Sequence, residues 1–235
     1  MSYQNTFGLP GPQTAHAQVY NTVRLNNQGV KYLPGGRVIN ATKSRDPLNT
    51  GYVTTLRPGM VMGMITATGL YAPSIIGLNT VLHDTSVVTT TMTLPAAVVT
   101  EITRRIGASG TFKITGPPTA AGTVATETVT YSAIASATTI TITATTADFA
   151  AGSVIRPTDG SEVPLCLIDD GDGIKVTDAD GTNIDQPFPF ALIGGTLNTD
   201  NIINYSSDSS VVAWLKGQLN NASNYGFVFN DAFQL

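Results

Sequence analysis

The stretch LRPGMVMGMITATGLYAP, residues 56–73, carries the clearest information about the fold. Its methionines alternate with other small or apolar residues, and successive side chains of a strand point to opposite faces. One face would carry Met60, Met62 and Met64, and the other Val61, Gly63 and Ile65. Because both faces are apolar, we predict a strand buried on two sides, with the methionines filling the core. A soft binding surface lined by methionine is the alternative.

The same stretch is predicted to form a hairpin. The strand is expected to continue through Thr66 and Thr68, to turn at Gly69, and to return along LYAPSIIG (70–77). Proline has no backbone N–H to donate to a neighbouring strand. Pro73 is therefore expected at a sheet edge or at the end of its strand.

Composition limits the classes of partner. Charged residues make up 12% of the 235 residues, the formal net charge is −4, and Arg104 and Arg105 form the only basic pair. Nucleic acid and anionic membranes are therefore predicted not to be partners. The N-terminus lacks the basic and apolar regions of a signal peptide, and no run of about 18 apolar residues occurs, so we expect a soluble chain without an export signal. Cys166 is the single cysteine and is predicted to be a small buried residue.

Residues 1–53 are predicted to form an extended arm. Turn-forming residues interrupt this region and leave two short extended pieces, QVYNTVRL (18–25) and GRVINAT (36–42). Such pieces have little core of their own and suit pairing with the exposed sheet edge of a partner. The alternative is that the arm wraps its own body.

Residues 81–164 are predicted to form a small antiparallel β-domain with a hydroxyl-rich outer face. Threonine-rich, alternating segments are expected as strands at 86–94, 110–116, 125–134, 138–146 and 152–157. A helix is expected within LPAAVVTEITRRIG (94–107), with Thr93 as its cap, Pro95 in its first turn and Gly107 at its end. A strand over 97–104 is the alternative.

The C-terminal third returns to hairpins and ends in a helix and a strand. Hairpins are expected over 162–184 and a strand over 188–198. The segment SDSSVVAWLKGQLNNA (207–222) is predicted to be a helix capped by Asp208 or Ser209. Its buried stripe would contain Val211, Trp214, Leu215 and Leu219. YGFVFNDAF (225–233) is expected to be the closing strand.

Residues 169–185 hold the densest group of carboxylates. The Asp-Gly pairs that begin at 159, 170, 172 and 180 are predicted to be hairpin turns with glycine at positive φ. A weak surface calcium site near Asp178 and Asp180 is the alternative, although the spacing of an EF-hand is absent. Asp169 and Asp170 are adjacent in a strand, so they would point to opposite faces and would not flank one glycosidic bond.

No catalytic motif accompanies these carboxylates. Neither His16 nor His83 lies near a recognisable serine or cysteine nucleophile motif, and the zinc-protease, P-loop and dinucleotide-binding patterns do not occur. We therefore predict that the protein is not an enzyme and has no catalytic, cofactor-binding or metal-binding residues.

Two separated blocks resemble a known family. They are TTLRPGMVMGMITATGLYAP (54–73) and FPFALIGGTLNTDNIINYSSDSSVVAWLKGQLNNASNYGFVF (188–229). Their order is similar to that of the lambda-type head decoration proteins of tailed bacteriophages, which have an Arg-Pro-Gly strand, an Ile-Thr-Ala-Thr-Gly turn, and later a strand, a short helix and a closing strand. The residues that match are Arg57, Pro58, Gly59, Gly63, Ile65, Thr66, Thr68, Gly69, Tyr71, residues 195–198, the helix around Trp214, and residues 227–229.

This chain departs from the family in two ways. An insert of about 85 residues (81–164) lies between the blocks, where the family member is usually small, and Met64 stands where a lysine is usual. An inserted β-domain explains the first difference, because insertions are tolerated at loop tips. Met64 would then contact the inserted domain or a neighbouring subunit.

The resemblance implies a mainly β fold of the β-tulip type with one or two short helices. Together with the residue patterns, it predicts an N-terminal capsid-binding arm (1–53), a decoration domain (54–80 and 165–235) and an inserted antiparallel β-domain (81–164). It implies a structural, non-enzymatic virion protein that forms homotrimers on the outer capsid surface, stabilises the expanded head as a cement protein, and occupies the host cytoplasm during assembly.

The partner implied by the resemblance is the major capsid protein, to which the arm would add a strand. The arm residues predicted to bind the capsid are Val19, Tyr20, Val23, Leu25, Val38 and Ile39. The alternative function is a host-surface or glycan-binding module, an adhesin or tail component, that uses the inserted β-domain.

Overall fold

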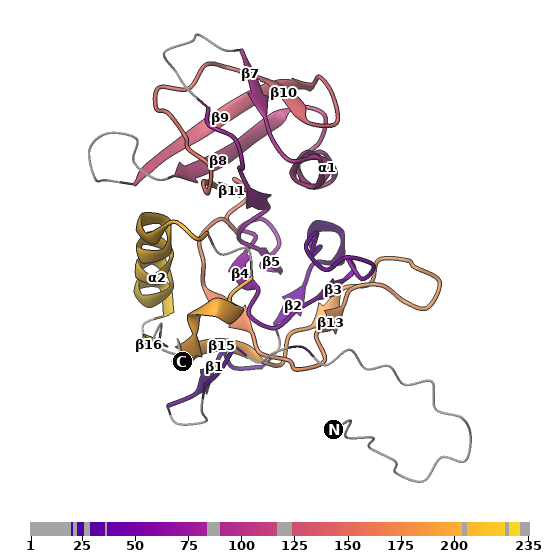
Figure 1. Ribbon diagram of the computed structural model, residues 1–235. Helices are drawn as coiled ribbons and strands as arrows, with labels where there is room; N and C mark the ends of the chain where they lie inside the picture. The colour runs from indigo at the N-terminus through magenta and orange to yellow at the C-terminus, as the bar shows by residue number, and fades with distance from the viewer. Residues whose placement is uncertain are drawn as a thin grey trace.

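The computed structural model describes residues 20, 23–25, 29–35, 37–83, 90–116, 124–203, 206–223 and 226–230. These residues form a mainly β protein with two short α-helices, two sheets that each curl into a half-barrel, and a small two-stranded sheet. The expectation of a mainly β fold is confirmed. In Figure 1 the six-stranded sheet lies above the eight-stranded sheet.

The eight-stranded sheet combines segments that are far apart in the sequence. Its order is β1 (Lys31–Tyr32), β15 (Ala191–Asn198), β12 (Cys166–Ile168), β4 (Val61–Met64), β5 (Tyr71–Pro73), β2 (Val38–Ile39) and β14 (Gln186–Pro187), and β16 (Phe227–Asn230) pairs in parallel with β15. The central pair β4–β12 places Met62 opposite Cys166, and both side chains are fully buried. The small sheet beside it pairs β3 (Thr55–Leu56) with β13 (Ile174–Lys175).

The six-stranded sheet is built from residues between 77 and 156. Its order is β6 (Gly77–Leu78), β11 (Val154–Arg156), β8 (Gly110–Gly116), β9 (Ala125–Ile134), β10 (Thr139–Ile142) and β7 (Thr91–Thr93). The bounds of β8 and β9 match the predicted strands, whereas β10 and β11 are shorter than predicted. Residues 86–89 of the first predicted strand (86–94) lie outside the described residues.

The hairpin that follows Arg57 is confirmed, but its first strand is shorter than predicted. β4 ends at Met64, because Ile65 N–H donates to Leu70 O and Gly69 N–H donates to Ile65 O, which closes a tight turn. The predicted continuation of the strand to Thr68 is therefore wrong. Gly69 takes φ +71°, and Pro73 is the last residue of β5, as predicted.

Met60 and Met62 fill the core, as predicted, and Met64 does not. The first two side chains are fully buried, whereas Met64 is 38% exposed. Met64 pairs with Tyr71 of β5, but β12 pairs with β4 only at Val61 and Met62, so Met64 has a paired strand on one side only. The prediction that all three methionines are core residues is wrong at this position.

Both predicted helices are present, and one of them begins differently from the prediction. Helix α1 (Ala96–Arg105) starts directly after Pro95, and Thr93 belongs to β7 instead of capping the helix. The alternative of a strand over 97–104 is wrong. Helix α2 (Ser209–Ser223) is capped by Asp208, whose Oδ1 accepts from the backbone N–H groups of Ser210 and Val211. Two 3₁₀ helices, η1 (Ala41–Lys43) and η2 (Thr199–Asn201), complete the helical segments described.

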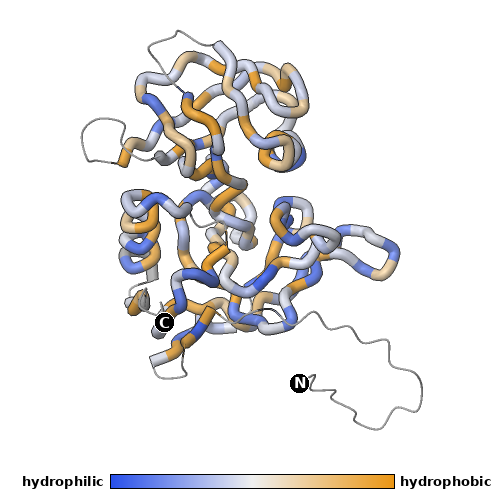
Figure 2. The backbone as a smooth tube through the Cα atoms, in the orientation of Figure 1, coloured by the Kyte–Doolittle hydropathy of each residue, from blue (hydrophilic) through white to orange (hydrophobic). Residues whose placement is uncertain are grey.

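The two large sheets meet at β6 and β11 of the six-stranded sheet. At these strands the chain crosses from the eight-stranded sheet (after β5) and returns to it (before β12). On β11, Val154 packs into the core of the eight-stranded sheet and Ile155 into the core beside α1, since successive side chains alternate. The chain at this crossing is apolar in Figure 2. The predicted division of the chain at residues 81 and 164 stays a prediction; β6, which was assigned to the decoration domain, pairs within the six-stranded sheet.

Two buried arginines also connect the sheets. Arg105 of α1 donates to Pro73 O and to Ser161 Oγ, and burial lowers its pKa to about 10. Arg156 of β11 lies over the ring of Trp214 in α2, 4.5 Å from its centroid, and burial lowers its pKa to about 10 as well. Each guanidinium therefore joins the six-stranded half to a segment of the other half.

Candidate functional site

Residues 23–25 and β1 of the predicted arm pair with β15 at one side of the eight-stranded sheet, whereas β2 lies within the sheet between β5 and β14. Leu25 N–H donates to Thr196 O (3.0 Å), Asn198 N–H donates to Val23 O (2.9 Å), and β1 pairs with the same strand, β15. Residues 23–25 and 31–33 therefore pair with the chain's own body, which was the alternative for the arm. Residues 1–19 lie outside the described residues.

A buried carboxylate fixes this edge segment. Arg24 Nε lies 2.5 Å from Asp169 Oδ2, and the Tyr32 hydroxyl donates to the same oxygen over 2.6 Å. The side chain of Asp169 is 1% exposed, which leaves its charge dependent on these two partners. Burial and the hydrogen bond to the carboxylate raise the pKa of Tyr32 to about 12, because an ionised phenolate would repel Asp169.

Replacing Tyr32 with phenylalanine is expected to lower the free energy of unfolding by about 2 kcal/mol at pH 8, the usual size of a lost hydrogen bond to a charged group. The folded-state pKa of Tyr32 is raised above the unfolded value of 10.0, so the folded state holds this proton more tightly. The contribution of Tyr32 is therefore fully present below about pH 10 and is lost as pH rises towards 12.

Urea unfolding of the unaltered protein and of Tyr32→Phe at pH 8 and pH 11 measures this effect. The difference between their free energies of unfolding should be smaller at pH 11. Tyr52→Phe, which changes an exposed phenol, is the control; an equal loss at both pH values for Tyr32→Phe would contradict the expectation.

The loop of residues 46–53 lies against the start of the described arm. Asn49 Nδ2 donates to the Tyr20 hydroxyl (3.0 Å), and Tyr20 N–H donates to Gly171 O. Asp46 is fully buried and accepts two hydrogen bonds from Arg57, at 2.6 and 3.0 Å. The hydrogen bond to Asp46 raises the pKa of the Arg57 guanidinium. The arm, this loop and the Arg-Pro-Gly motif thus form one connected site.

The loop turns large apolar side chains towards solvent. Leu48 is 57% exposed, Tyr52 56% and Val53 44%. No Asp, Glu, Lys or Arg occurs between residues 47 and 54. Sequence reasoning treated this region only as turns in the arm, although the uncharged run containing Leu48, Tyr52 and Val53 could have drawn attention to it.

The arm residues predicted to bind the capsid have different places in the structure. Val23 and Ile39 are fully buried in the chain's own cores, Tyr20, Leu25 and Val38 are half-buried, and Val19 lies outside the described residues. In this conformation the Val23 and Ile39 side chains stabilise the body and are not available to another protein. A role in capsid binding stays a prediction for the other four.

Two motif glycines allow distant segments of the chain to pack closely. A Cβ on Gly59, which has φ +84°, would lie 2.0 Å from Asn201 O, and a Cβ on Gly63 would lie 2.1 Å from Ser161 O. Gly59 N–H also donates to Ile168 O, and Ile203 N–H donates to Gly59 O. Pro58 joins Arg57 to this tightly packed glycine.

The remaining motif residues have structural roles. Thr66 and Thr68 lie in the turn after β4, where Thr66 N–H donates to Asp159 O and Thr68 Oγ1 accepts from Leu70 N–H. Tyr71 is buried edge-to-face against Phe188, with ring centroids 5.7 Å apart. Trp214 is partly buried and covers the guanidinium of Arg156.

Among the carboxylates of residues 169–185, Asp170 and Asp178 act locally as turn caps, whereas Asp169 binds Arg24 and Tyr32, and Asp185 accepts from Ala41 N–H. Asp178 Oδ1 accepts from the backbone N–H groups of Asp180 and Thr182, and Gly160, Gly173 and Gly181 take the positive φ predicted for their turns. Gly171, which was predicted to do the same, does not appear among the described glycines with positive φ. In the described part of the chain, no group of three His, Cys, Asp or Glu side chains could hold a metal ion.

Two further ionisable groups that the structure describes, His83 and Cys166, are buried. His83 Nε2 lies 2.9 Å from Thr145 Oγ1 beside the β-bridge to Phe149, and His16 lies outside the described residues. Cys166 is buried, as predicted, and burial raises the pKa of its thiol.

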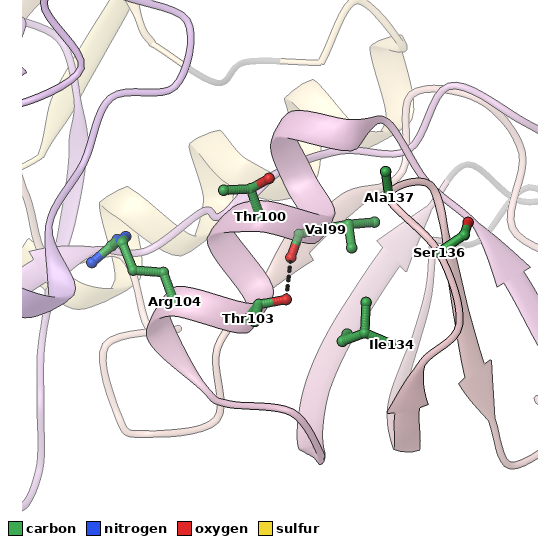
Figure 3. Close-up of a pocket in the computed structure, with 7 residues that line it drawn as sticks. All are labelled: Val99, Thr100, Thr103, Arg104, Ile134, Ser136 and Ala137. Atoms are coloured by element: carbon green, nitrogen blue, oxygen red, sulfur yellow. Dashed lines mark hydrogen bonds between the residues drawn. The ribbon is translucent and has the colours of Figure 1, made fainter.

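One shallow cavity of about 520 Å³ lies between α1 and the turn that joins β9 to β10. It is lined by Val99, Thr100, Thr103, Arg104, Ile134, Ser136 and Ala137, as Figure 3 shows. The hydroxyls of Thr100 and Thr103 donate to carbonyls of their own helix, and Arg104 donates to Glu101 and to Thr42 O. None of the seven residues is aromatic, so the cavity lacks the ring platform on which a sugar stacks.

Among the residues that the structure describes, no helix has the length and apolar character needed to cross a bilayer. No family model, curated protein or solved structure matched the chain. The functional proposal therefore rests on the sequence motifs and on the geometry of the described residues.

Proposed function

We propose that this protein is a capsid decoration, or cement, protein: a non-enzymatic virion component that binds the outer surface of a tailed-phage head as a homotrimer. It would stabilise the expanded head by binding the major capsid protein, without nucleic acid, membrane or cofactor. The host cytoplasm during assembly and then the outer capsid surface would be its locations. The eight-stranded sheet would be the β-tulip-like decoration domain.

The observation that carries this proposal is the contact between the two blocks that resemble the decoration family. The blocks are separated by 114 residues, yet β4 and β5 of the first and β15 and β16 of the second belong to one sheet. Gly59 in the first block packs against Asn201 in the second, with a backbone hydrogen bond from Ile203 to Gly59. A chance likeness of two short motifs would not require them to meet in this way.

The N-terminus supports the proposed mode of attachment. The first 23 residues contain no Asp, Glu, Lys or Arg, and residues 23–25 already continue as an edge segment of the eight-stranded sheet. We propose that residues 1–19 pair with an exposed strand of the capsid protein, where main-chain hydrogen bonds give affinity. Many identical weak contacts across the lattice would then clamp neighbouring capsomers and resist the pressure of the packaged genome.

Removal of residues 1–19 is expected to weaken binding to undecorated expanded heads by roughly 30-fold or more, the equivalent of about two lost backbone hydrogen bonds at ~1 kcal/mol each. The structure sharpens the choice of truncation. A deletion reaching residue 50 would also remove β1, β2 and Asp46, and so would disturb the body itself. Co-sedimentation of the protein with expanded heads measures the effect.

A variant with residues 1–19 in permuted order is the matched control, because it keeps length and composition. It should bind as weakly as the truncated protein if strand register matters. If full-length protein does not bind the heads, the cement function is wrong. If both altered proteins bind like the full-length chain, the arm is not the anchor.

The alternative function, a host-surface or glycan-binding module, would use the six-stranded half. The cavity beside α1 is the observation in its favour, although its lining is mostly apolar. Saturable binding of the full chain to a glycan array, abolished by Ala137→Trp in the cavity wall, would favour this alternative over the cement function.

A further inference from the structure

The apolar side chains of the 46–53 loop form an exposed surface that needs an explanation. Leu48, Tyr52 and Val53 lie within six residues, and each is more than two-fifths exposed. Single exposed apolar residues are common, but aromatic and aliphatic side chains grouped without charge are typical of the centre of a protein interface. We propose that Leu48, Tyr52 and Val53 seat the body of the protein on the capsid protein, beside the place where the arm attaches.

The loop is held in one conformation before any partner binds. Asp46 N–H donates to Val53 O (2.9 Å), and Tyr52 N–H donates to Asn49 O (2.8 Å). Asn49 Nδ2 donates to Tyr52 O and Thr55 O, and Asp46 is held by Arg57. Because the backbone is already ordered, a partner would bind without the entropic cost of ordering the loop.

The position of the arm identifies the occupant. Tyr20, the first residue described, receives a hydrogen bond from Asn49 of the same loop. A protein held by residues 1–19 is therefore brought next to Leu48 and Tyr52, and attachment at one point raises the effective concentration at the other. This step rests on the proposed function, in which the arm binds the capsid protein.

The chemistry of the loop also describes the facing surface. Residues 47–54 carry no formal charge, and the nearby Asp46 is neutralised by Arg57. A charged patch on the partner would lose its hydration against this loop without gaining an opposite charge. The contact surface on the capsid protein is therefore uncharged and apolar.

The test compares two leucines with almost equal exposure. Leu48 is 57% exposed in the proposed contact surface, and Leu82 is 56% exposed in the six-stranded half. Leu48→Ser and Tyr52→Ser are each expected to raise the Kd for undecorated expanded heads by at least tenfold, the usual size for a central contact residue. Leu82→Ser should leave the Kd within about twofold of the unaltered chain, as expected for a residue outside the contact.

Three measurements separate the outcomes: the urea midpoint, binding to expanded heads and the oligomeric mass of the free protein. The urea midpoint of each variant shows whether it folds, and Val53→Ser replaces any variant that does not. If the unaltered chain binds heads and Leu48→Ser, Tyr52→Ser and Val53→Ser all bind equally well, the contact surface is wrong while the cement function stands. If the unaltered chain does not bind heads, the cement function itself fails. If the substitutions instead change the oligomeric mass of the free protein, the loop binds a second copy and the proposal is overturned.

Discussion

Replacing Gly59 with alanine is expected to lower the free energy of unfolding by about 4 kcal/mol. Two costs add at this position. A residue with a Cβ at positive φ costs roughly 1–2 kcal/mol, and overpacking a filled site costs roughly 1–3 kcal/mol, with the upper end apt for a clash with backbone. Gly59 has φ +84°, and its Cβ would lie 2.0 Å from Asn201 O.

Gly69→Ala is the matched control for the backbone cost alone. Gly69 has φ +71°, and a Cβ there would have no atom within 4 Å, so this variant should lose only about 1–2 kcal/mol. Urea unfolding of the three proteins, monitored by the fluorescence of Trp214, measures both losses. Equal destabilisation by the two substitutions would mean that the Gly59 Cα is not in close contact with Asn201 O.

The second large effect is expected at Arg57. Arg57→Ala would leave the fully buried carboxylate of Asp46 without its two hydrogen bonds. Breaking a buried ion pair by removing one partner costs roughly 3–5 kcal/mol, and we expect about 3 kcal/mol because Arg57 itself is partly exposed. Capsid affinity should fall as well, since Asp46 is one end of the loop that carries Leu48 and Tyr52.

Two further variants test the cause of this loss. Lys113→Ala removes the partner of Glu162 in a more exposed ion pair and should cost less than about 1 kcal/mol. The double variant Asp46→Ala/Arg57→Ala removes both charges and should lose less than the sum of the two single variants. Additive losses in chemical denaturation would show that the two side chains do not stabilise the fold as a pair.

The strands were the most predictable part of the fold. β8 and β9 were predicted with their observed bounds, because an alternating pattern over seven or more residues reports one covered face. The end of β4 was predicted less well, since Ile65 and Thr66 continue the pattern in sequence while the hydrogen bond from Gly69 to Ile65 O closes a turn. The prediction that Thr93 caps α1 was wrong for a similar reason, because Thr93 belongs to β7 and pairs with Thr139 of β10.

The candidate site was predictable only in part. The motif residues Arg57 and Gly59 were found from their order in the sequence, but the reason for each lies in a distant residue, Asp46 or Asn201. Arm residues such as Val23 looked available for a partner because the arm has little core of its own. The body supplies that core, and Val23 fills part of it.

The sequence by itself determined the mainly β class, the two short helices, the buried thiol of Cys166 and the hairpin at Gly69. These features depend on side-chain alternation, capping and turn chemistry within a few residues, which are all local properties. Only the tertiary structure decided that Met64 is exposed, that Asp46 and Asp169 are buried and paired with arginines, and that the loop carrying Leu48 and Tyr52 is hydrogen-bonded through Asn49 to Tyr20. Those outcomes depend on which distant segments cover a side chain, and burial and ion pairing are properties of that arrangement in space.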